Sequence, residues 1–403
     1  EACGRRRAPA AAGAVTPRGL EACMKEVAAS PGPWRAGGFQ LVRRLQESAE
    51  HPGRVDVMAP AGDEAAAVAV KCLPRSWVTS GPREFDEKHP EAAERPWCDL
   101  GLLRQLGRLG YPHVCELLDV LQDEDHLYVV TSLAAEGDLL AWCKAAPPPG
   151  RPREAAALPI AAEALTALWR LHELGVAHRD VSLENLLLAG AGGGGAPRVK
   201  LVDFAMSTLS RSCRDEVRGK PAYHAPEMHG SAAYDPFLSD AFAFGVVLYS
   251  LATNDYPWKS TSPDCCKLFE YASVFGLRKY LEKRRPRQAA GGCLAEVLSR
   301  PLAELLEGLL ELEPRDRLSL GEACFEEEGR RSAWEMRWLA AGACEAEPLP
   351  CRQLPKGPRQ ELLRRARLQG AGTRGGAGGD ARGADPKVRH QRRRGVTVMA
   401  CCV

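Results

Sequence analysis

The spacing of hydrophobic residues changes character partway along the chain. In the first part, short apolar runs alternate with polar residues and are broken by Gly and Pro, which predicts strands. These runs lie at residues 39–45, 54–59, 65–73 and 126–133. A helical stretch around residues 100–109 interrupts them, and after Leu133 apolar residues recur at spacings of three and four. The helical runs lie at residues 155–175, 238–252 and 299–312. The pattern predicts a small, mostly β lobe followed by a larger helical lobe.

Both ends of the chain differ from this part in composition. Residues 1–33 are rich in Ala, Arg, Pro and Gly without hydrophobic periodicity, so we expect a flexible leader. Residues 336–403 are rich in Gly and basic side chains, so we expect a disordered basic tail. The tail ends with Cys401 and Cys402 beside a basic cluster. This composition is compatible with membrane association through S-acylation, although an ordinary disordered tail is the favoured interpretation.

The composition is that of a soluble globular protein. Of the 403 residues, 45% are hydrophobic and 26% are charged, which argues against wholesale disorder and against a fibrous structure. The net charge of +2 is too balanced for a dedicated nucleic-acid binder, so no nucleic-acid partner is expected. The longest strongly apolar run, Ala241 to Ala252, is shorter than the roughly 20 residues of a membrane-spanning helix, so no transmembrane span is expected. The 15 cysteines lack a paired spacing, which favours a reducing compartment and a cytoplasmic location.

Four short strings of chemically distinctive residues follow one another along the chain. VAVK ends at Lys71, HRDVSLEN runs from His178 to Asn185, KLVDFA contains Asp203, and APE ends at Glu227. In this order the strings resemble those of the eukaryotic protein kinase family, of the serine/threonine type, over residues 34–335. The resemblance implies an α+β, two-lobed kinase fold. Its small antiparallel β lobe would span residues 34–131, its hinge 132–134 and its mostly helical large lobe 135–335.

The resemblance assigns the charged residues of these strings to phosphoryl transfer, a reaction that needs positioning and charge neutralisation more than covalent help. Asp180 would accept or orient the proton of the attacking hydroxyl, and Lys71 would clamp the α and β phosphates of ATP. Asn185 and Asp203 would hold Mg²⁺ against the phosphate oxygens. Taken singly, such residues have ordinary structural interpretations, such as a helix cap or a strand end. It is their joint order that favours the catalytic interpretation.

The resemblance also implies a set of residues around the nucleotide. The predicted ATP-binding residues are Val55, Ala69, Lys71, Thr131, Ser132, Leu133, Asp138, Leu187 and Asp203. Ala69 and Leu187 would enclose the adenine ring, although both also suit a plain core position. Thr131 would stand at the back of the pocket, and Asp138 would lie near the ribose.

Other residues of the resemblance concern structure and regulation. Glu227 and Arg317 would form a buried ion pair, and Asp240 would support the loop that carries Asp180. Arg179, beside the catalytic Asp, could bind a phosphate placed on the loop that follows Asp203. The hydroxyls available there are Ser207, Thr208, Ser210 and Ser212.

Three positions depart from the usual kinase pattern. Where a G-x-G-x-x-G loop is expected, the chain has LQESAEHPGRV, in which only Gly53 remains, so close approach of the backbone to the phosphates is in question. DFA replaces DFG, and Ala205 removes the permissive glycine after the metal-binding aspartate. The third position is that of the glutamate that usually pairs with Lys71, because Glu94 is separated from the predicted helix by Pro96. The helical register places Asp99 at that position, for which a capping role is the alternative.

A fourth departure joins two positions near Asp180. Serine/threonine kinases usually carry Lys two residues after the catalytic Asp and Thr at the start of the substrate-facing loop. This chain has Ser182 and Lys220 there. We hypothesise that hydroxyl and ammonium have exchanged places, with Lys220 supplying positive charge near Asp180 and Ser182 as its hydrogen-bonding partner. The alternative is that Lys220 is a solvated loop residue.

The favoured function is a protein kinase that uses ATP and Mg²⁺ to phosphorylate serine or threonine hydroxyls of a protein substrate. The alternative is a pseudokinase, a binding or scaffolding module with weak or no catalysis, and the degraded Gly-rich loop is its main support. A small-molecule kinase is a weaker third interpretation, because APE and the helix after it belong to a protein-substrate platform.

Overall fold

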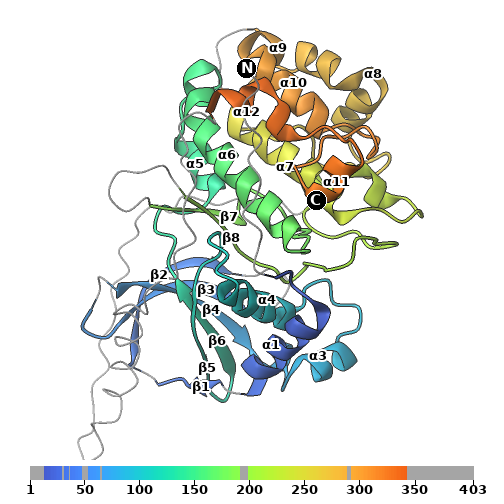
Figure 1. Ribbon diagram of the computed structural model, residues 1–403. Helices are drawn as coiled ribbons and strands as arrows, with labels where there is room; N and C mark the ends of the chain where they lie inside the picture. The colour runs from blue at the N-terminus through green and yellow to red at the C-terminus, as the bar shows by residue number, and fades with distance from the viewer. Residues whose placement is uncertain are drawn as a thin grey trace, which may run out of the picture.

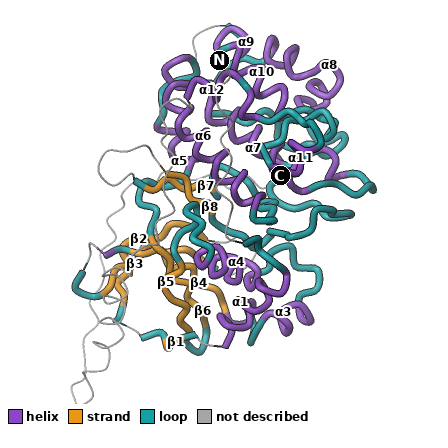
Figure 2. The backbone as a smooth tube through the Cα atoms, viewed as in Figure 1, coloured by secondary structure: helices purple, strands orange, loops and turns teal. Residues whose placement is uncertain are grey.

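The computed structural model describes residues 13–29, 31–35, 37–47, 53–63, 66–190, 198–287 and 292–342. Figure 1 shows two lobes, one built on a β-sheet and the other from helices. Figure 2 shows the strands gathered in the small lobe, except for β7 (Leu186–Ala189) and β8 (Arg198–Leu201), which pair at the junction of the lobes. The predicted two-lobed α+β architecture is confirmed.

The small lobe contains a six-stranded sheet with the strand order β1-β5-β6-β4-β3-β2. Its strands are β1 (Gly32–Pro33), β2 (Phe39–Glu47), β3 (Arg54–Pro60), β4 (Val68–Pro74), β5 (Leu117–Gln122) and β6 (His126–Ser132). Neighbouring strands are antiparallel, apart from β1 and β5, which are parallel. Along β4, buried Val68 and Val70 alternate with half-buried Ala69 and Lys71, because successive side chains of a strand point to opposite faces. The alternation brings Ala69 and Lys71 to one face of the sheet.

Three helices follow β4 in the small lobe: α2 (Arg75–Val78), α3 (Pro82–Lys88) and α4 (Pro96–Arg108). Helix α4 begins with a proline, which is tolerated in the first turn because no intrahelical donor is needed there. Its Trp97 and Leu100 belong to the same core cluster as Val120 of β5 and Val129 of β6. The predicted helix is therefore present, and its apolar face holds it against the sheet.

The expected flexible leader is wrong for residues 17–29, which form helix α1 (Pro17–Ala29). Leu20, Cys23 and Val27 are buried at a spacing of three and four, so the Ala-rich segment hides a short amphipathic pattern. Helix α1 packs on α4 where Gly101 has no side chain. A Cβ at Gly101 would lie 2.6 Å from Met24 Cγ and 2.9 Å from Leu20 Cδ1. The two helices therefore approach more closely than larger residues would allow.

The large lobe is built around one buried helix, α7 (Pro236–Thr253). The other helices of the large lobe are α5 (Leu139–Ala145), α6 (Arg151–Glu173), α8 (Lys267–Lys283), α9 (Leu294–Val297), α10 (Arg300–Leu309), α11 (Ala323–Glu327) and α12 (Arg337–Gly342). Short 3-10 helices lie at η2 (Pro221–Tyr223), η3 (Pro226–His229) and η4 (Ala333–Glu335). Helix α7 is apolar and long enough to cross a membrane, but every residue of it is buried inside the lobe, which identifies it as a core helix.

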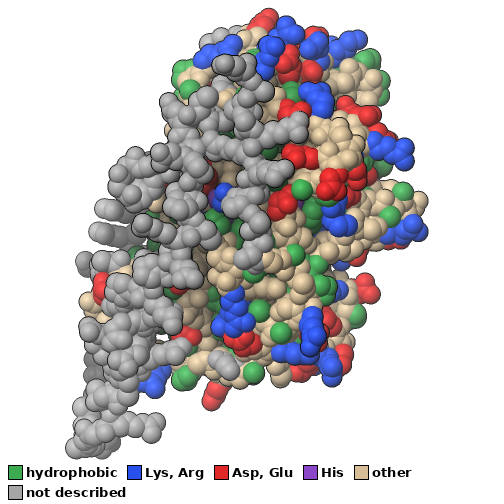
Figure 3. Space-filling view, in the orientation of Figure 1, with side chains coloured by type: hydrophobic (Ala, Val, Ile, Leu, Met, Phe, Trp, Pro, Cys, Tyr) green, Lys and Arg blue, Asp and Glu red, His purple; other side chains and the backbone are tan. Residues whose placement is uncertain are grey.

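The large lobe extends past the predicted boundary at residue 335. Trp338 and Leu339 of α12 are buried in the main core, so the chain still belongs to the folded lobe there. The rest of the predicted tail, including Cys401 and Cys402, lies outside the described residues, as do residues 1–12 of the predicted leader. The cysteines within the described ranges are free thiols. On the face drawn in Figure 3, basic and acidic side chains are intermixed, as the balanced net charge suggests.

Candidate active site

The HRD loop (residues 177–185) lies between α6 and β7, and the carboxylate of Asp240 holds its backbone in place. Asp240 of α7 is buried, and its two oxygens accept hydrogen bonds from the main-chain N–H groups of His178 (2.7 Å) and Arg179 (2.8 Å). Hydrogen bonds to an ionised acceptor are stronger than neutral ones, so this contact holds the loop firmly. The predicted support of the loop by Asp240 is confirmed.

Among the described residues, one carboxylate oxygen of Asp180 accepts a hydrogen bond and the other does not. Its Oδ2 accepts a hydrogen bond of 2.6 Å from Asn185 Nδ2. Its Oδ1 is buried and has no hydrogen-bond partner among the described residues. Burial raises the pKa of Asp180 to about 7, although the positive charge of Lys220 acts in the opposite direction. The free oxygen is a proton acceptor of suitable basicity for a hydroxyl brought next to it.

Lys71 on β4 is held between two carboxylates. Its Nζ lies 3.1 Å from Asp99 Oδ2 on α4 and 3.2 Å from Asp203 Oδ1. Burial alone would lower the pKa of Lys71, but the charges of Asp203 and Asp99 outweigh burial and raise it, so the ammonium stays charged. Asp99 Oδ1 also accepts a hydrogen bond of 3.0 Å from the main-chain N–H of Phe204. The predicted pairing of Asp99 with Lys71 is confirmed, because α4 lies close enough for the shorter carboxylate to reach both partners.

The predicted ATP-binding residues of the small lobe lie on adjacent strands. Strand pairing sets Val55 opposite Lys71 and Ala69 opposite Thr131. Ser132 ends β6, and Leu133 follows it toward the large lobe. These side chains are half-buried, whereas alternate residues of β4 are buried. Residues 48–52, in the middle of the degraded Gly-rich loop, lie outside the described residues.

The predicted ATP-binding residues of the large lobe also meet. A β-bridge joins Asp138 to Leu187 of β7. Leu187 is half-buried between two buried leucines, so it belongs to the more open face of that strand. The carboxylate of Asp138 already accepts a hydrogen bond of 2.7 Å from the N–H of Ala141 and caps helix α5. Contact of these residues with a nucleotide stays a prediction.

Asn185 and Asp203 offer the oxygen donors that Mg²⁺ prefers. Asn185 Nδ2 donates to the main-chain oxygen (2.8 Å) and to Oδ2 (2.6 Å) of Asp180, and its amide oxygen takes no part in these bonds. Burial would raise the pKa of Asp203, but the charge of Lys71 lowers it, so the carboxylate stays ionised. In the part of the chain that the structure describes, no group of three or more His, Cys, Asp or Glu could hold a metal. The donor set fits a Mg²⁺ that completes its coordination with phosphate oxygens and water.

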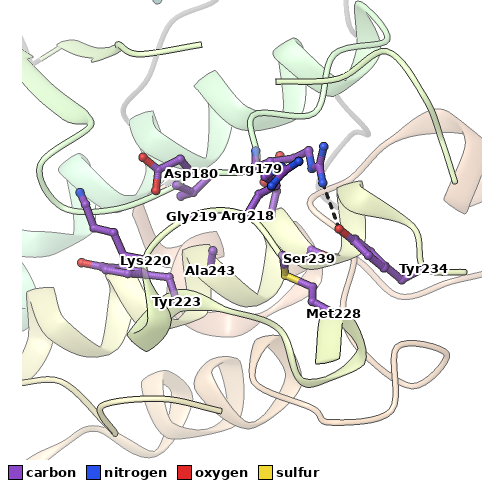
Figure 4. Close-up of a pocket in the computed structure, with 12 residues that line it drawn as sticks. Arg179, Asp180, Arg218, Gly219, Lys220, Tyr223, Met228, Tyr234, Ser239 and Ala243 are labelled. Atoms are coloured by element: carbon purple, nitrogen blue, oxygen red, sulfur yellow. Dashed lines mark hydrogen bonds between the residues drawn. The ribbon is translucent and has the colours of Figure 1, made fainter. Parts of the chain in front are cut away.

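Lys220 reaches the HRD loop from the segment that leads into η2. Its Nζ donates a hydrogen bond of 2.7 Å to Ser182 Oγ and lies 3.2 Å from Glu184 Oε2. Figure 4 shows Lys220 and Asp180 on one side of a small pocket, with Arg179, Arg218 and Tyr234 on the other. The predicted contact between Lys220 and Ser182 is therefore formed, and Lys220 is not a freely solvated residue.

Two buried ionic contacts support the large lobe. Arg317 is 1% exposed, and its two terminal nitrogens lie 2.6 Å and 2.9 Å from the carboxylate oxygens of Glu227, which confirms the predicted ion pair. The second contact was missed by sequence reasoning. His172 of α6 lies between Glu322 (Nδ1 to Oε1, 2.6 Å) and Asp240 (Nε2 to Oδ2, 3.0 Å). No motif or local spacing links His172 to Glu322, 150 residues further along the chain.

A contact on the loop after Asp203 was also missed. Arg179 Nη2 lies 2.7 Å from Glu216 Oε2, although sequence reasoning had considered only phosphorylated hydroxyls as partners of this arginine. The signal available in the sequence was an acidic residue between Asp203 and Glu227. That signal is weak, because the loop mixes charges of both signs.

Comparison with known proteins agrees with this geometry. A family model described as the protein kinase domain matches residues 66–327, more than half of the chain. CBL-interacting protein kinase 4 of Oryza sativa subsp. japonica is 36% identical over 217 residues, which are 52% of this chain and 43% of that protein. Serine/threonine-protein kinase ULK3 of Homo sapiens is 28% identical over 293 residues, which are 72% of this chain and 54% of that protein.

A third relative is matched over only a small part of its own length. Serine/threonine-protein kinase 36 of Pongo abelii is 32% identical over 215 residues, which are 52% of this chain but 14% of that protein. The chain thus spans about half or less of the length of these curated relatives. The residues that the family model matches, 66–327, contain the HRD loop, Lys71 and Asp203. The chain belongs to the protein kinase domain family.

Proposed function

We propose that this chain is an ATP-dependent protein kinase that phosphorylates serine and threonine side chains. The observation that carries the proposal is the charged network at the junction of the lobes. Lys71 is bound to both Asp99 and Asp203, and Asp180 keeps one buried carboxylate oxygen without a partner among the described residues. Leaving a buried polar atom without a hydrogen bond costs free energy, and a substrate hydroxyl that donates to Asp180 would remove that cost.

The residues divide the work of phosphoryl transfer between them. Lys71 binds the α and β phosphates, and the carboxylate of Asp180 accepts the proton of the substrate hydroxyl. The hydroxyl oxygen forms a bond to the γ-phosphorus of ATP, while the bond from that phosphorus to the oxygen bridging the β-phosphate breaks and ADP leaves. Bound by Asn185 and Asp203, Mg²⁺ would neutralise charge on the phosphate oxygens.

Lys220 supplies a second positive charge beside the transferring phosphate. Its ammonium opposes the rise in the pKa of Asp180 that burial causes. It is held by Ser182 and Glu184, so its position is defined. A positive charge at this point stabilises the negative charge that spreads over the transferred group. Ser182 orients the ammonium through its hydroxyl.

The nucleotide would bind between the two lobes. The adenine would be enclosed by Ala69 from β4 and Leu187 from β7, both of which are half-buried apolar side chains. The remaining contacts would come from Val55, Thr131, Ser132, Leu133 and Asp138. Apolar walls with a few polar groups are the usual composition of a small-molecule site.

The test is transfer of labelled γ-phosphate from Mg·ATP to generic protein substrates and to the protein itself. Native protein is compared with Asp180→Asn, and with Asp316→Asn as a matched control at an exposed position of the large lobe. We expect transfer by the native protein and the control, and loss of transfer in Asp180→Asn because its amide cannot accept the proton. Nucleotide binding without transfer in the native protein would contradict the proposal and favour a pseudokinase.

A further inference from the structure

The loop between Asp203 and Glu227 is anchored to the HRD loop by a carboxylate of its own. Arg179 has a side chain that is 6% exposed, and its Nη2 lies 2.7 Å from Glu216 Oε2. Arg218 Nε approaches the same oxygen at 3.9 Å. One carboxylate therefore lies between two guanidinium groups, one of which is almost completely buried.

Tyr234 contacts both Arg179 and Glu216. Arg179 Nη2 donates to Tyr234 OH at 3.2 Å, as Figure 4 shows, and the same hydroxyl donates to the main-chain oxygen of Glu216. Two main-chain hydrogen bonds between Cys213 and Tyr234 hold the loop just before this point, at 2.9 Å and 2.8 Å. Both the side chain and the backbone of Glu216 are thus fixed against Arg179.

The carboxylate is a strong partner for Arg179 because it remains ionised. Partial burial would raise the pKa of Glu216, but the hydrogen bond and the charge of Arg179 outweigh burial and lower it. A buried guanidinium that loses its carboxylate keeps the cost of desolvation without compensation. Arg179 therefore depends more on this carboxylate than an exposed arginine would, although the Glu216 side chain itself is 43% exposed.

The anchor lies shortly before the residues that contact Asp180. Gly219 has a φ of +90°, and a Cβ there would lie 2.8 Å from the main-chain oxygen of Arg179 and 3.3 Å from Asp180 Oδ1. The backbone therefore passes directly against the catalytic carboxylate, and the next residue, Lys220, contacts Ser182. A loop released at Glu216 would lose the geometry that places Lys220 beside Asp180.

The loop hydroxyls make other contacts. Ser207 Oγ donates to the main-chain oxygen of His178 at 3.2 Å, and Ser210 Oγ donates to the main-chain oxygen of Ser212 at 2.7 Å. Thr208 Oγ1 accepts a hydrogen bond of 3.1 Å from the main-chain N–H of Ser210. The position against Arg179 that a phosphate would take is filled by Glu216.

We propose that Glu216 is a positioning residue that holds this loop in its catalytic arrangement, so that transfer proceeds without phosphorylation of the loop. The inference rests on the proposed kinase activity. Glu216 acts through Arg179 and through the backbone that leads to Lys220, and it does not touch the reacting atoms.

The test compares native protein with Glu216→Gln, Glu216→Asp and the matched control Asp215→Asn, each with and without phosphatase treatment. Asp215 is the exposed neighbour of Glu216, and its positive φ of 54° suits Asn, so this variant should behave as the native protein. The kcat and KM for protein substrate and for ATP are measured, together with thermal unfolding. Digestion by trypsin after half-buried Arg218 reports the state of the loop without reference to activity.

We expect about a tenfold loss of kcat in Glu216→Gln, because a neutral amide loses the charge-assisted part of the contact with Arg179. Cleavage after Arg218 should accelerate in this variant, and its unfolding temperature should fall because Arg179 loses its charged partner, while the protein stays folded at the assay temperature. Glu216→Asp should recover part of the kcat, and phosphatase should leave native activity unchanged. Equal kcat and equal cleavage in native protein and Glu216→Gln would overturn the inference, as would loss of native activity after phosphatase treatment. If native protein transfers no phosphate, the proposed function fails, and the cleavage rates still decide whether Glu216 holds the loop.

Discussion

Replacing Asp99 tests the most specific departure of this chain from its family. Asp99 is 4% exposed and binds Lys71 Nζ through Oδ2 (3.1 Å) and the Phe204 N–H through Oδ1 (3.0 Å). In Asp99→Asn, the amide oxygen can keep the contact with Phe204, but the negative charge beside Lys71 is lost. The substitution therefore keeps the shape of the site, but it replaces the oxygen that accepts from Lys71 with an NH2 group that cannot accept.

The expected magnitude follows from the two carboxylates around Lys71. Breaking a buried ion pair by removing one partner costs about 3–5 kcal/mol. Lys71 keeps Asp203 at 3.2 Å, so we expect a smaller cost of about 2–3 kcal/mol for this variant. This cost is a loss of unfolding free energy, and kcat/KM for ATP should fall as well because Lys71 is no longer held at the phosphate site by Asp99.

Asp99→Glu tests whether the spacing of α4 is matched to the shorter side chain. An extra methylene in a packed, buried site costs about 1–3 kcal/mol. Helix α1 also packs closely on α4 at Gly101, which opposes an outward shift of α4. We therefore expect Asp99→Glu to be less active than native protein, although it restores the side chain that is usual in the family.

The assay is steady-state transfer of labelled phosphate with varied ATP, accompanied by thermal unfolding to confirm that each variant is folded. Asp86→Asn, an exposed position on α3, is the matched control for loss of one negative charge. A kcat/KM of Asp99→Asn equal to that of the control would refute the reasoning. Higher activity of Asp99→Glu than of native protein would show that α4 adapts to the longer side chain.

Two further predictions concern His172 and the pair Lys220 and Ser182. Burial alone would lower the pKa of His172, but its hydrogen bonds to Asp240 and Glu322 raise it to about 9. Its contribution to stability is therefore complete below its ordinary pKa of about 6.5 and is lost as pH rises through 9. Denaturant unfolding between pH 6.5 and 9.5 should show a smaller decline in unfolding free energy in His172→Gln than in native protein, and parallel curves would contradict this. For Lys220 and Ser182, kcat is measured in Lys220→Thr, in Ser182→Lys and in the double variant, and the three values are compared with native protein in a double-mutant cycle. We expect the double variant to recover activity relative to the single variants, whereas additive losses would argue against the exchange.

The alternation of apolar and polar residues was sufficient to predict the two lobes. Val68 and Val70 alternate with Ala69 and Lys71 in the sequence as they do on the sheet, because strand periodicity is a local property. The register of α4 was readable for the same reason, and it placed Asp99 against Lys71. Local periodicity therefore determined which side chains share a face, and the order of the motifs determined the family.

At the two ends of the folded part of the chain, composition predicted the structure less well than hydrophobic periodicity did. Residues 17–29 are rich in Ala and have little overall hydrophobicity, yet Leu20, Cys23 and Val27 bury one stripe of a helix against α4. A short apolar stripe stabilises a helix only when a partner surface receives it, and that surface comes from residues far along the chain. The same holds for α12, where Trp338 and Leu339 complete the large-lobe core.

The amino-acid sequence by itself determined the fold class, the positions of Lys71, Asp180, Asn185 and Asp203, and the contact of Lys220 with Ser182 as a hypothesis. Only the tertiary structure decided that Glu216 neutralises Arg179 and that His172 joins Asp240 to Glu322. A buried charge requires a partner, but many acidic residues could serve, and the sequence does not rank them. The choice is made when loops fold back onto the core, because only then does one carboxylate come within hydrogen-bonding distance of the buried cation.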